Sequence, residues 1–227
     1  MSDLTPTQRS RVKRLHERGA YDLDTIASIL DAGVLCHVGY VIDGQPYVTP
    51  TAYWREGGQV YWHGSSASRM LRTLEKGIDA CFTVSHLDGF VLARSGFNYS
   101  INYRSAMLFG RAHKVEEEGA KLRALENFLE RMFPGRWQDL RPPTTKEIKA
   151  TTVLGMAIEE GSAKVRTGWP HDDEEDYSWP VWAGVVPVRA VMQPPLPDER
   201  LVGSKEPPAY LADLSHLGLK SGLRLRT

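Results

Sequence analysis

The 227-residue sequence contains few cysteines and no long apolar run. Cys36 and Cys81 lie in apolar stretches without CxxC or Cys/His spacing, which argues against a structural zinc site and predicts buried thiols. No stretch of about 18 apolar residues occurs, and the N-terminus lacks an apolar signal segment. We therefore expect a soluble, cytoplasmic protein without membrane contact and without a bound metal ion.

An excess of one charge is also lacking, since Lys and Arg number 28 and Asp and Glu number 28. This balance argues against nucleic acid as a partner. The basic run at 9–18 and the acidic run at 172–176 are interpreted as solvated surfaces. The motifs GxGxxG, GxxxxGK[ST] and GxSxG are missing, so the signatures of Rossmann, P-loop and serine-hydrolase sites are not found.

Turn signals divide the first part of the chain into antiparallel strands. Asp43-Gly44 separates two β-rich runs, and Gly57-Gly58 separates the next two, which predicts consecutive hairpins. A long strand over 79–95, interrupted near Asp88-Gly89, continues the pattern. Further strands are expected within 102–115 and 151–160.

Apolar spacing and capping signals predict helices between these strands. They are a short polar helix at 7–18, a helix within 21–33 capped by Asp22 or Asp24, a helix over 68–76 closed by Gly77, and an amphipathic helix at 116–133. Hairpins, a crossover helix and more antiparallel strands predict a small β-barrel with helices outside. We expect an N-terminal helical extension (1–20), a barrel domain (21–169) and an irregular C-terminal extension packed on the barrel (170–227).

The stretch YWHGSSASRML, residues 61–71, passes from a predicted strand into a predicted helix. A helix start presents unpaired backbone N–H groups that attract anions. Ser65, Ser66 and Ser68 add hydroxyl groups, and Arg69 adds a permanent charge suited to phosphate. The stretch therefore predicts a phosphate pocket. The alternative is ordinary capping of the helix by Ser66.

Four ordered motifs carry a family resemblance: GQPYVTPTAYW, YWHGSSASRML, DGFVLARSGFNYSINYRSAMLFGRA and GSAKVR. Together they resemble the flavin-binding proteins related to pyridoxamine 5′-phosphate oxidase, in particular the branch of nitroimidazole-resistance-type proteins. The resemblance spans roughly Arg18 to Val188. It implies a mainly β, antiparallel split β-barrel with flanking helices, which forms a homodimer and holds FMN at the subunit interface.

The resemblance also implies roles for individual residues. The strand over 46–54 would line the isoalloxazine ring, mostly through its backbone, with Thr49, Pro50, Thr51 and Tyr53 as cofactor-binding residues. The ribityl chain and phosphate would be held by Trp62, His63, Ser65, Ser68 and Arg69. The pair Arg104-Ser105 falls where oxidases of the family carry a flavin-contacting Arg-Gln pair.

Other residues leave two interpretations open. His63 is as readily a structural histidine, and His37, His86 and His113 are expected to be structural. Lys164 and Arg166 would share a face just after a strand and either reach the flavin or an acidic substrate, or form an exposed strand end. The tryptophans of the late segment, Trp169, Trp179 and Trp182, would shield the flavin or anchor that segment, and Trp182 is taken as a cofactor-binding residue.

Two departures from the oxidases argue against vitamin B6 oxidation. Met70 replaces the basic residue after the phosphate-binding arginine, and the ending SGLRLRT lacks the arginine-containing substrate motif. The leading hypothesis is an FMN-dependent oxidoreductase that takes electrons from NAD(P)H or a reduced partner and passes them to a small organic molecule. No catalytic side chain is predicted, because the cofactor carries the chemistry. The alternatives are a flavin-binding or storage protein and a haem-binding or haem-degrading protein.

Overall fold

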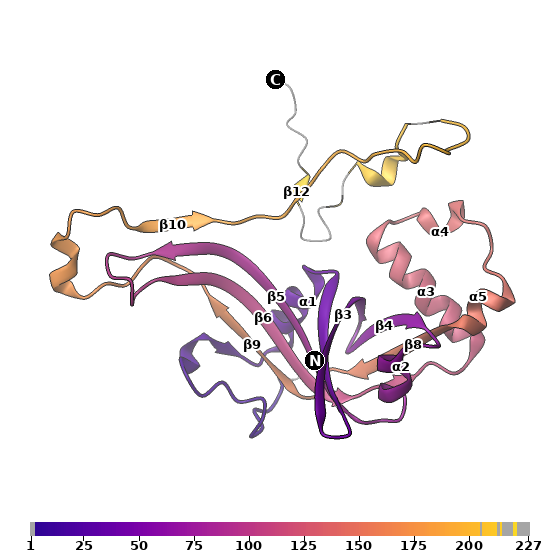
Figure 1. Ribbon diagram of the computed structural model, residues 1–227, viewed down its shortest axis with the longest axis horizontal. Helices are drawn as coiled ribbons and strands as arrows, with labels where there is room; N and C mark the ends of the chain where they lie inside the picture. The colour runs from indigo at the N-terminus through magenta and orange to yellow at the C-terminus, as the bar shows by residue number, and fades with distance from the viewer. Residues whose placement is uncertain (1–2, 205, 213, 215–219, 222–227) are drawn as a thin grey trace.

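A curled antiparallel β-sheet forms most of the molecule, with helices around it (Figure 1). The computed structural model describes residues 3–204, 206–212, 214, 220 and 221. In space the main sheet runs β1-β9-β6-β5-β2-β3-β4-β8-β7, and β10 also pairs with β5. Its strands are β1 (Gly19–Ala20), β2 (Leu35–Ile42), β3 (Gln45–Glu56), β4 (Gln59–Ser65), β5 (Asp79–Leu92), β6 (Ser100–Arg111), β7 (His113–Lys114), β8 (Thr151–Ala157), β9 (Gly161–Arg166) and β10 (Gly184–Pro187). The predicted mainly β, split-barrel fold class is confirmed.

Five α-helices and three short 3₁₀ helices accompany the sheet within the described residues. They are α1 (Leu23–Asp31), α2 (Arg69–Leu74), α3 (Glu118–Met132), α4 (Arg136–Asp139), α5 (Thr145–Ala150), η1 (His16–Arg18), η2 (Glu174–Ser178) and η3 (Ala209–Leu211). A separate parallel pair joins β11 (Val191–Met192) to β12 (Lys220–Ser221). None of the described helices combines the length and apolar character needed to cross a bilayer.

The hairpin turns lie where the sequence predicted them. Asp43 and Gly44 both have positive φ, 50° and 78°, as a two-residue turn with primed geometry requires. Gly57, at φ 54°, makes the same adjustment between β3 and β4. In β5 the register shifts between Leu87 and Gly89, so the predicted interruption is a β-bulge.

Two apolar cores hold the sheet. The larger one fills the barrel, where α1 contributes Ile26, Ile29 and Leu30. The smaller one lies where α3 covers the other side of the sheet and packs Phe128 against Trp54 and Val153. These contacts follow from the apolar stripes that predicted α1 and α3. The cap of α1 is also as predicted, since Asp22 accepts the Thr25 N–H at 2.7 Å.

Some predicted elements differ from the structure. The expected helix at 7–18 is wrong: the segment contains only η1, and Arg9 instead forms an ion pair with Glu160 at 2.6 Å. Lys164 and Arg166, expected just after a strand, lie within the complete strand β9, and α4 and α5 were not predicted. In the described part of the extension after 170 the regular elements are short, and β10 pairs with the outer end of β5. Residues 222–227, part of the ending used above, lie outside the described residues.

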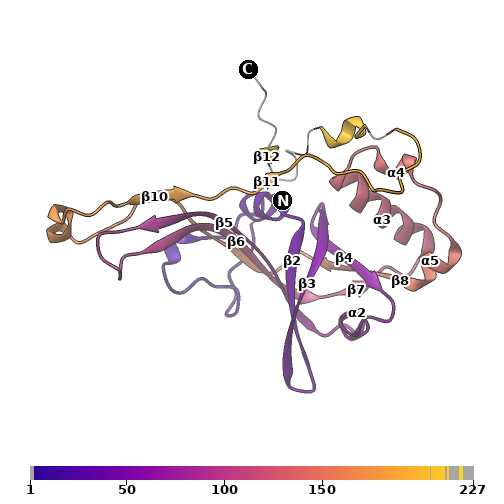
Figure 2. The same cartoon turned by 45° about the horizontal axis from the view of Figure 1, so that its top comes forward.

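The outer ends of β5 and β6 extend well beyond the barrel (Figures 1 and 2). Chain 167–187 returns along them and adds β10 to the edge of β5 that β2 occupies further along. We call the combination of residues 87–102 and 167–187 the arm.

Candidate functional site at the split between β3 and β4

The site lies where β3 and β4 separate. They pair only through Tyr53–Glu56 and Gln59–Trp62. Beyond this point β3 remains paired with β2, and β4 continues along β8. The edge of β3 over 45–52 that faces away from β2 therefore has no strand partner within the described sheet.

Two prolines in β3 fit this unpaired edge. Pro46 and Pro50 are paired in register with Val41 and His37 of β2. Proline has no N–H and is accepted in a sheet where its nitrogen faces away from the neighbouring strand. The prolines share this side with the backbone of Val48, because residues two apart point their polar groups the same way. The edge thus offers backbone groups to a planar, hydrogen-bonding ligand.

The end of β4 and the start of α2 face this edge. Ser68 is the N-cap residue of α2, and its side chain makes no capping hydrogen bond. The alternative of capping by Ser66 is therefore wrong; the Ser66 N–H instead donates to the Ala150 carbonyl at 2.8 Å. The Ser65 hydroxyl accepts the Ala67 N–H at 3.2 Å. The hydroxyl of Ser68 is thus not used in capping and is available to a ligand.

Two arginines stand at this helix start. The guanidinium carbon of Arg69 lies 4.4 Å from the centre of the Tyr47 ring on β3, so it bridges the split. Arg72, one turn later, donates from Nε to the Ser66 carbonyl at 2.8 Å. Arg72 was not predicted, although its i+3 spacing from Arg69 was a usable signal. Arg72 adds a second positive charge at this helix start. Met70, which stands where the oxidases carry a basic residue, is buried.

His63 lies on the side of β4 that faces α3. Its ring centre is 4.8 Å from that of Phe128 and 6.0 Å from that of Trp54. Burial in this aromatic setting lowers the pKa of His63 below the ordinary value for histidine. Its Nδ1 atom is buried and has no hydrogen-bond partner among the described residues. Burial thus favours the uncharged form of the His63 imidazole, and none of the described residues bonds its Nδ1 atom.

Several predicted cofactor residues point into the barrel instead. Tyr53 and Trp62 are fully buried in the main core, and the Tyr53 hydroxyl donates to the Leu30 carbonyl at 2.5 Å. Burial raises the pKa of Tyr53. Thr49 bonds the hydroxyl of Tyr40 at 3.1 Å, whereas Thr51 makes only a long contact of 3.5 Å with the Ala52 carbonyl. The side chains of Tyr53 and Trp62 are therefore not available to a ligand, and their backbones pair with each other in the sheet.

A second group of predicted residues lies away from the split. Arg104 forms two hydrogen bonds with Asp88, at 2.8 and 2.9 Å, across the bulge of β5. Ser105 donates to the Lys164 carbonyl at 3.3 Å, and the Lys164 amine donates to the Arg14 carbonyl at 3.1 Å. Trp182 lies in the arm, just before β10. The structure does not bring these residues together with Arg69 in one chain.

One broad face of the sheet is exposed and apolar. Directly paired residues point to the same side, and the register places His37, Pro50 and Thr83 together with Met107. Further exposed apolar side chains on this side are Leu35, Val41, Val48, Leu87, Phe90, Ile101 and, from β10, Val186. We call this side the outer face. Such a large exposed apolar surface marks an interaction site.

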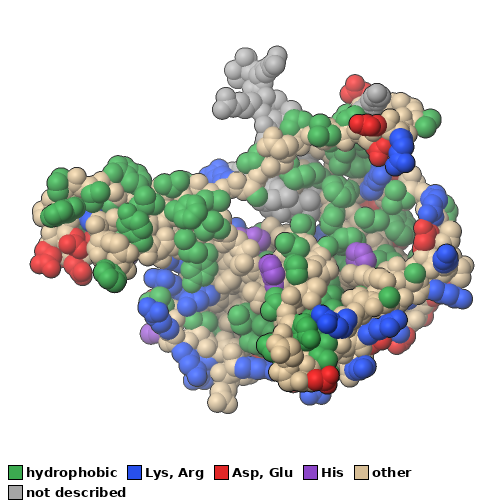
Figure 3. Space-filling model, viewed as in Figure 1, with side chains coloured by type: hydrophobic (Ala, Val, Ile, Leu, Met, Phe, Trp, Pro, Cys, Tyr) green, Lys and Arg blue, Asp and Glu red, His purple; other side chains and the backbone are tan. Residues whose placement is uncertain are grey.

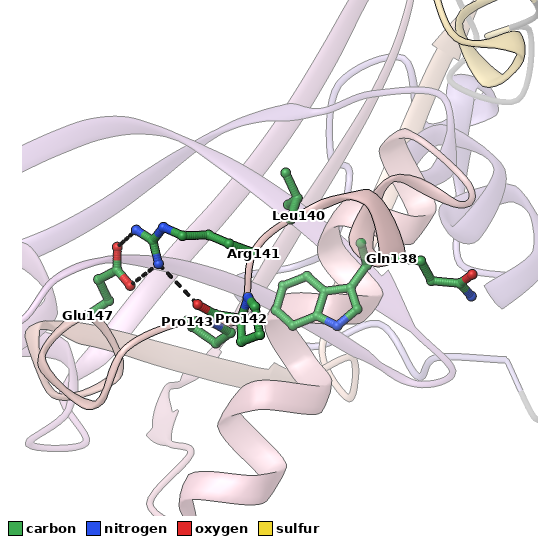
Figure 4. Close-up of a pocket in the computed structure, with 7 residues that line it drawn as sticks. Gln138, Leu140, Arg141, Pro142, Pro143 and Glu147 are labelled. Carbon is green, nitrogen blue, oxygen red and sulfur yellow. Dashed lines mark hydrogen bonds and ion pairs between the residues drawn. The ribbon is translucent and has the colours of Figure 1, made fainter. Parts of the chain in front are cut away.

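An open pocket of about 550 Å³ lies elsewhere, between α4 and α5 (Figure 4). Its walls include Trp137, Leu140 and Pro142. The charged groups at its rim are paired with each other, since Arg141 bonds Glu147 at 2.5 and 3.0 Å. The hydrogen bonds from Arg141 and Thr144 lower the pKa of Glu147 to about 2. No unpaired charge therefore marks this pocket as a phosphate site.

Comparison with known proteins places this site in a family context. The family model described as pyridoxamine 5′-phosphate oxidase matches residues 22–165. The chain is similar to the flavocytochrome Anf3 from Azotobacter vinelandii, with 50% identity, a TM-score of 0.88, and 92% of this chain and 97% of that chain covered. It is also similar to the FAD and heme binding protein from Mycobacterium smegmatis, with 36% identity, a TM-score of 0.83, and 87% and 97% covered.

A more distant structure shares the fold. A protein from Bacteroides thetaiotaomicron assigned to 5-nitroimidazole antibiotic resistance has 24% identity and a TM-score of 0.54, with 65% of this chain and 86% of that chain covered. No curated protein matches the chain. The resemblance identified from the four motifs is confirmed, and the chain belongs to the pyridoxamine 5′-phosphate oxidase family.

Proposed function

We propose that this protein is an oxidoreductase that binds a flavin nucleotide and a haem and passes electrons between a reduced donor and a small acceptor. The observation that carries the proposal is the 50% identity with a flavocytochrome over 92% of the chain. The relative from M. smegmatis supports it, because its description also combines a flavin with haem. The proposal joins the FMN-dependent oxidoreductase expected from the sequence with the haem-binding alternative.

The residues at the split fit a flavin nucleotide. The helix start of α2, the Ser68 hydroxyl and the guanidinium of Arg69 suit a phosphate, and Arg72 adds charge nearby. The unpaired edge of β3 suits the polar edge of the isoalloxazine ring. FMN, as expected from the sequence, and FAD both carry a phosphate next to the ribityl chain. Because the phosphate contacts suit both nucleotides, the affinities for FMN and FAD, measured by titration, show which one the protein prefers.

His63 is the residue that best fits a haem iron. A haem ligand must be a neutral imidazole, and burial lowers the pKa of His63. The rings of Trp54 and Phe128 lie beside it and make its surroundings apolar. By contrast, His86 already bonds the Ile29 carbonyl at 2.9 Å. His63 thus changes from a predicted flavin contact to a proposed haem ligand.

We place the flavin between two copies of the chain. The apolar outer face, with Val48 68% exposed, suits burial against a second copy. The unpaired edge of β3 borders this face, so a flavin along it would contact both copies. The homodimer expected from the sequence is therefore part of the proposal.

When bound, the flavin accepts two electrons and the haem exchanges one at a time, which links a two-electron donor to a one-electron acceptor. The protein residues orient these groups. Arg69 and Ser68 would hold the phosphate, the β3 backbone would orient the ring, and the buried imidazole of His63 would bind the iron. NAD(P)H or a reduced protein is the proposed donor. A storage protein, the remaining alternative, would hold the flavin without turnover.

Spectra of the purified protein test this function. We expect oxidised-flavin bands after FMN or FAD addition, a Soret band after hemin addition, and bleaching of the flavin by NADH, NADPH or a chemical reductant coupled to haem reduction. His63→Ala should shift or abolish the Soret band, whereas His113→Ala should leave it unchanged. Hemin bound identically by the wild type and His63→Ala would contradict the haem site. Flavin that stays oxidised with both NADH and NADPH would support storage.

A further inference from the structure

Cations without a carboxylate partner gather around the end of α5. On α2 and the turn after it, Arg69, Arg72 and Lys76 follow one another at spacings of three and four residues, which places them on one side. On α5, Lys146 and Lys149 stand three residues apart. Among the described residues, none of these five side chains has a carboxylate within ion-pair distance.

Hydrogen bonds bring the two helices together at one turn of the chain. Arg72 donates to the Ser66 carbonyl at 2.8 Å, and the Ser66 N–H donates to the Ala150 carbonyl at 2.8 Å. Lys121 of α3 reaches the same turn, where its amine donates to the Ile148 carbonyl at 3.4 Å. We call the six cations around this turn the basic surface; they are Arg69, Arg72, Lys76, Lys121, Lys146 and Lys149.

The carboxylates that neighbour these cations in the chain are already paired with other residues. Glu75 bonds Lys114 at 3.5 Å, and Glu147 bonds Arg141 at 2.5 Å. The basic surface therefore keeps an excess of positive charge, although the formal net charge of the whole chain is zero. Figure 3 shows Lys and Arg side chains gathered over the part of the molecule where Figure 1 draws α2.

The basic surface borders the residues proposed for both cofactors. Arg69, at its edge, is the proposed contact of the flavin phosphate. The register of β4 and β8 pairs His63, the proposed haem ligand, with Val153, and it pairs Ser65 with Thr151, the first residue after α5. An electron carrier bound to this surface would therefore stand close to both proposed sites.

The size of the basic surface suits a protein better than a small anion. Lys76 lies seven residues beyond Arg69, which is about 10 Å at the rise of a helix. Lys76, Lys146 and Lys149 are exposed and belong to two different helices, so they do not converge on one phosphate. Complementary charges spread over such an area steer and orient a protein partner.

The basic surface lacks the apolar component typical of a membrane-binding helix. Such helices insert large apolar side chains into the bilayer next to their cations. Here Met70, Leu71 and Leu74 of α2 and Ile148 of α5 are all buried in the protein. A soluble partner with an acidic surface is therefore favoured.

The basic run near the N-terminus is less suitable for delivering electrons. Arg11, Lys13 and Arg14 are exposed, but this segment lies beside β9, where Lys164 donates to the Arg14 carbonyl at 3.1 Å. Most of the sheet separates β9 from β4, and Figure 1 shows the first segment of the chain and α2 on different sides of the barrel. These three cations thus provide a matched control far from the proposed sites.

We propose that the basic surface is the docking site of an acidic electron-carrier protein that reduces the bound flavin. This inference rests on the proposed function and identifies the reduced donor as a protein. Two one-electron carriers, each oxidised in turn, supply the two electrons of one flavin, and protons come from solvent. Opposite charges should raise the association rate by about ten- to a thousand-fold, and salt should remove this gain.

Stopped-flow reduction of the flavin-loaded protein tests the docking site. The probe is a reduced, acidic [2Fe–2S] ferredoxin at low ionic strength, and the flavin absorbance reports the arrival of electrons. The lysine variant, Lys76→Glu with Lys146→Glu and Lys149→Glu, should lower the second-order rate constant by about tenfold or more. Added salt should slow the wild type and remove most of this difference. A wild-type rate that does not depend on salt would overturn the inference.

The matched control is Arg11→Glu with Lys13→Glu and Arg14→Glu, which changes the net charge by the same amount. It should lower the rate constant much less than the lysine variant does. Equal losses in the two variants would show that only net charge matters and would overturn the inference. An unchanged rate constant in the lysine variant would also overturn it.

Two further measurements separate the docking site from the proposed function. Light-driven reduction by deazariboflavin, which is uncharged, should be equal in the wild type and the lysine variant. If no flavin binds, the proposed function fails, and calorimetric titration with oxidised ferredoxin still tests the docking site. Ferredoxin binding that the lysine variant loses supports it, and no binding by the wild type overturns it.

Two remaining outcomes concern other donors and other surfaces. Flavin reduced by ferredoxin but not by NADH or NADPH supports the protein donor and argues against storage. Vesicles that contain phosphatidylserine test the membrane alternative. Vesicle binding that the lysine variant loses, without ferredoxin binding, would overturn the inference in favour of a lipid surface.

Discussion

Arg69 and Tyr47 join the two halves of the split barrel, because the guanidinium carbon lies 4.4 Å from the centre of the tyrosine ring. Tyr47 in turn stacks on Tyr40, with ring centres 5.6 Å apart and an angle of 16° between the planes. The arginine is thus held over the open edge of β3 by a stack that begins in the main core. This position allows a phosphate at the start of α2 to be bound with little reorganisation.

Arg69→Ala should weaken FMN binding on the order of ten- to a hundred-fold, since hydrogen bonds to charged groups are worth roughly 1.5–3 kcal/mol. Riboflavin has no phosphate, so its affinity should change little. Ser68→Ala should have a milder effect because it removes a neutral group. Flavin fluorescence titration measures all of these affinities. Equal losses for FMN and riboflavin would contradict a phosphate site at this position.

Arg104→Gln should have little effect on flavin affinity, because Arg104 is engaged with Asp88 at the bulge of β5. Both side chains are about a third exposed, so the pair contributes less than about 1 kcal/mol to the free energy of unfolding. Titration with FMN and urea unfolding measure the two quantities. A loss of FMN affinity as large as that of Arg69→Ala would restore the flavin contact predicted for Arg104 from the sequence.

The protein without haem should become less stable in mild acid because of His63. Burial lowers the pKa of His63 in the folded protein, whereas the unfolded chain titrates near 6.5. Below that pH the unfolded state binds more protons. The free energy of unfolding should therefore fall with decreasing pH, by at most about 1.4 kcal/mol per pH unit from this group. Urea unfolding between pH 8 and pH 5 should show a weaker dependence for His63→Leu than for the wild type. An unchanged slope would contradict this assignment.

Asp172→Asn should loosen the arm without unfolding the barrel. Desolvation opposes ionisation of Asp172, but the hydrogen bonds from Arg94 and Ser95 outweigh it and lower its pKa. The carboxylate therefore stabilises the arm above the ordinary carboxyl pKa, and this contribution is lost as pH falls through the lower folded value. At neutral pH we expect trypsin to cleave after Arg94 sooner in Asp172→Asn. Asp173→Asn is the control, because the Asp173 carboxylate lies next to Asp172 in the chain and makes no capping hydrogen bond with η2. Equal cleavage rates in both variants would contradict the anchoring role.

Val48→Glu should weaken the proposed dimer and its flavin binding together. The substitution places a charge on the apolar outer face, next to the unpaired edge of β3. Light scattering gives the mass in solution, and titration gives the flavin affinity. Lys76→Glu, a matched exposed position after α2, should leave the mass unchanged. A monomeric wild type that binds flavin tightly would contradict the placement of the site between two copies.

The sequence alone predicted several short-range features of the structure. The turn at Asp43-Gly44, the Asp22 cap and the bulge near Asp88 depend on backbone preferences within a few residues, so local pattern was sufficient. The passage from β4 into α2 was predictable for the same reason. The 7–18 segment was not, because its contact with Glu160 is about 150 residues away and replaces the helix that local composition favoured.

Local sequence patterns did not predict the direction of side chains or the pairing of distant strands. Which of Tyr53, Trp62 and His63 faced the core depended on strand register, since neighbouring residues in a strand point to opposite sides. Folding pairs Arg104 with Asp88 of the bulge in β5, and it places Trp182 away from the split of the same chain because β10 pairs with the far end of β5. Residue types and spacing thus specified the kind of fold and the turn for which we propose phosphate binding. The pairing of distant strands determined which side chains meet there, because contacts between remote segments form only once the sheet closes.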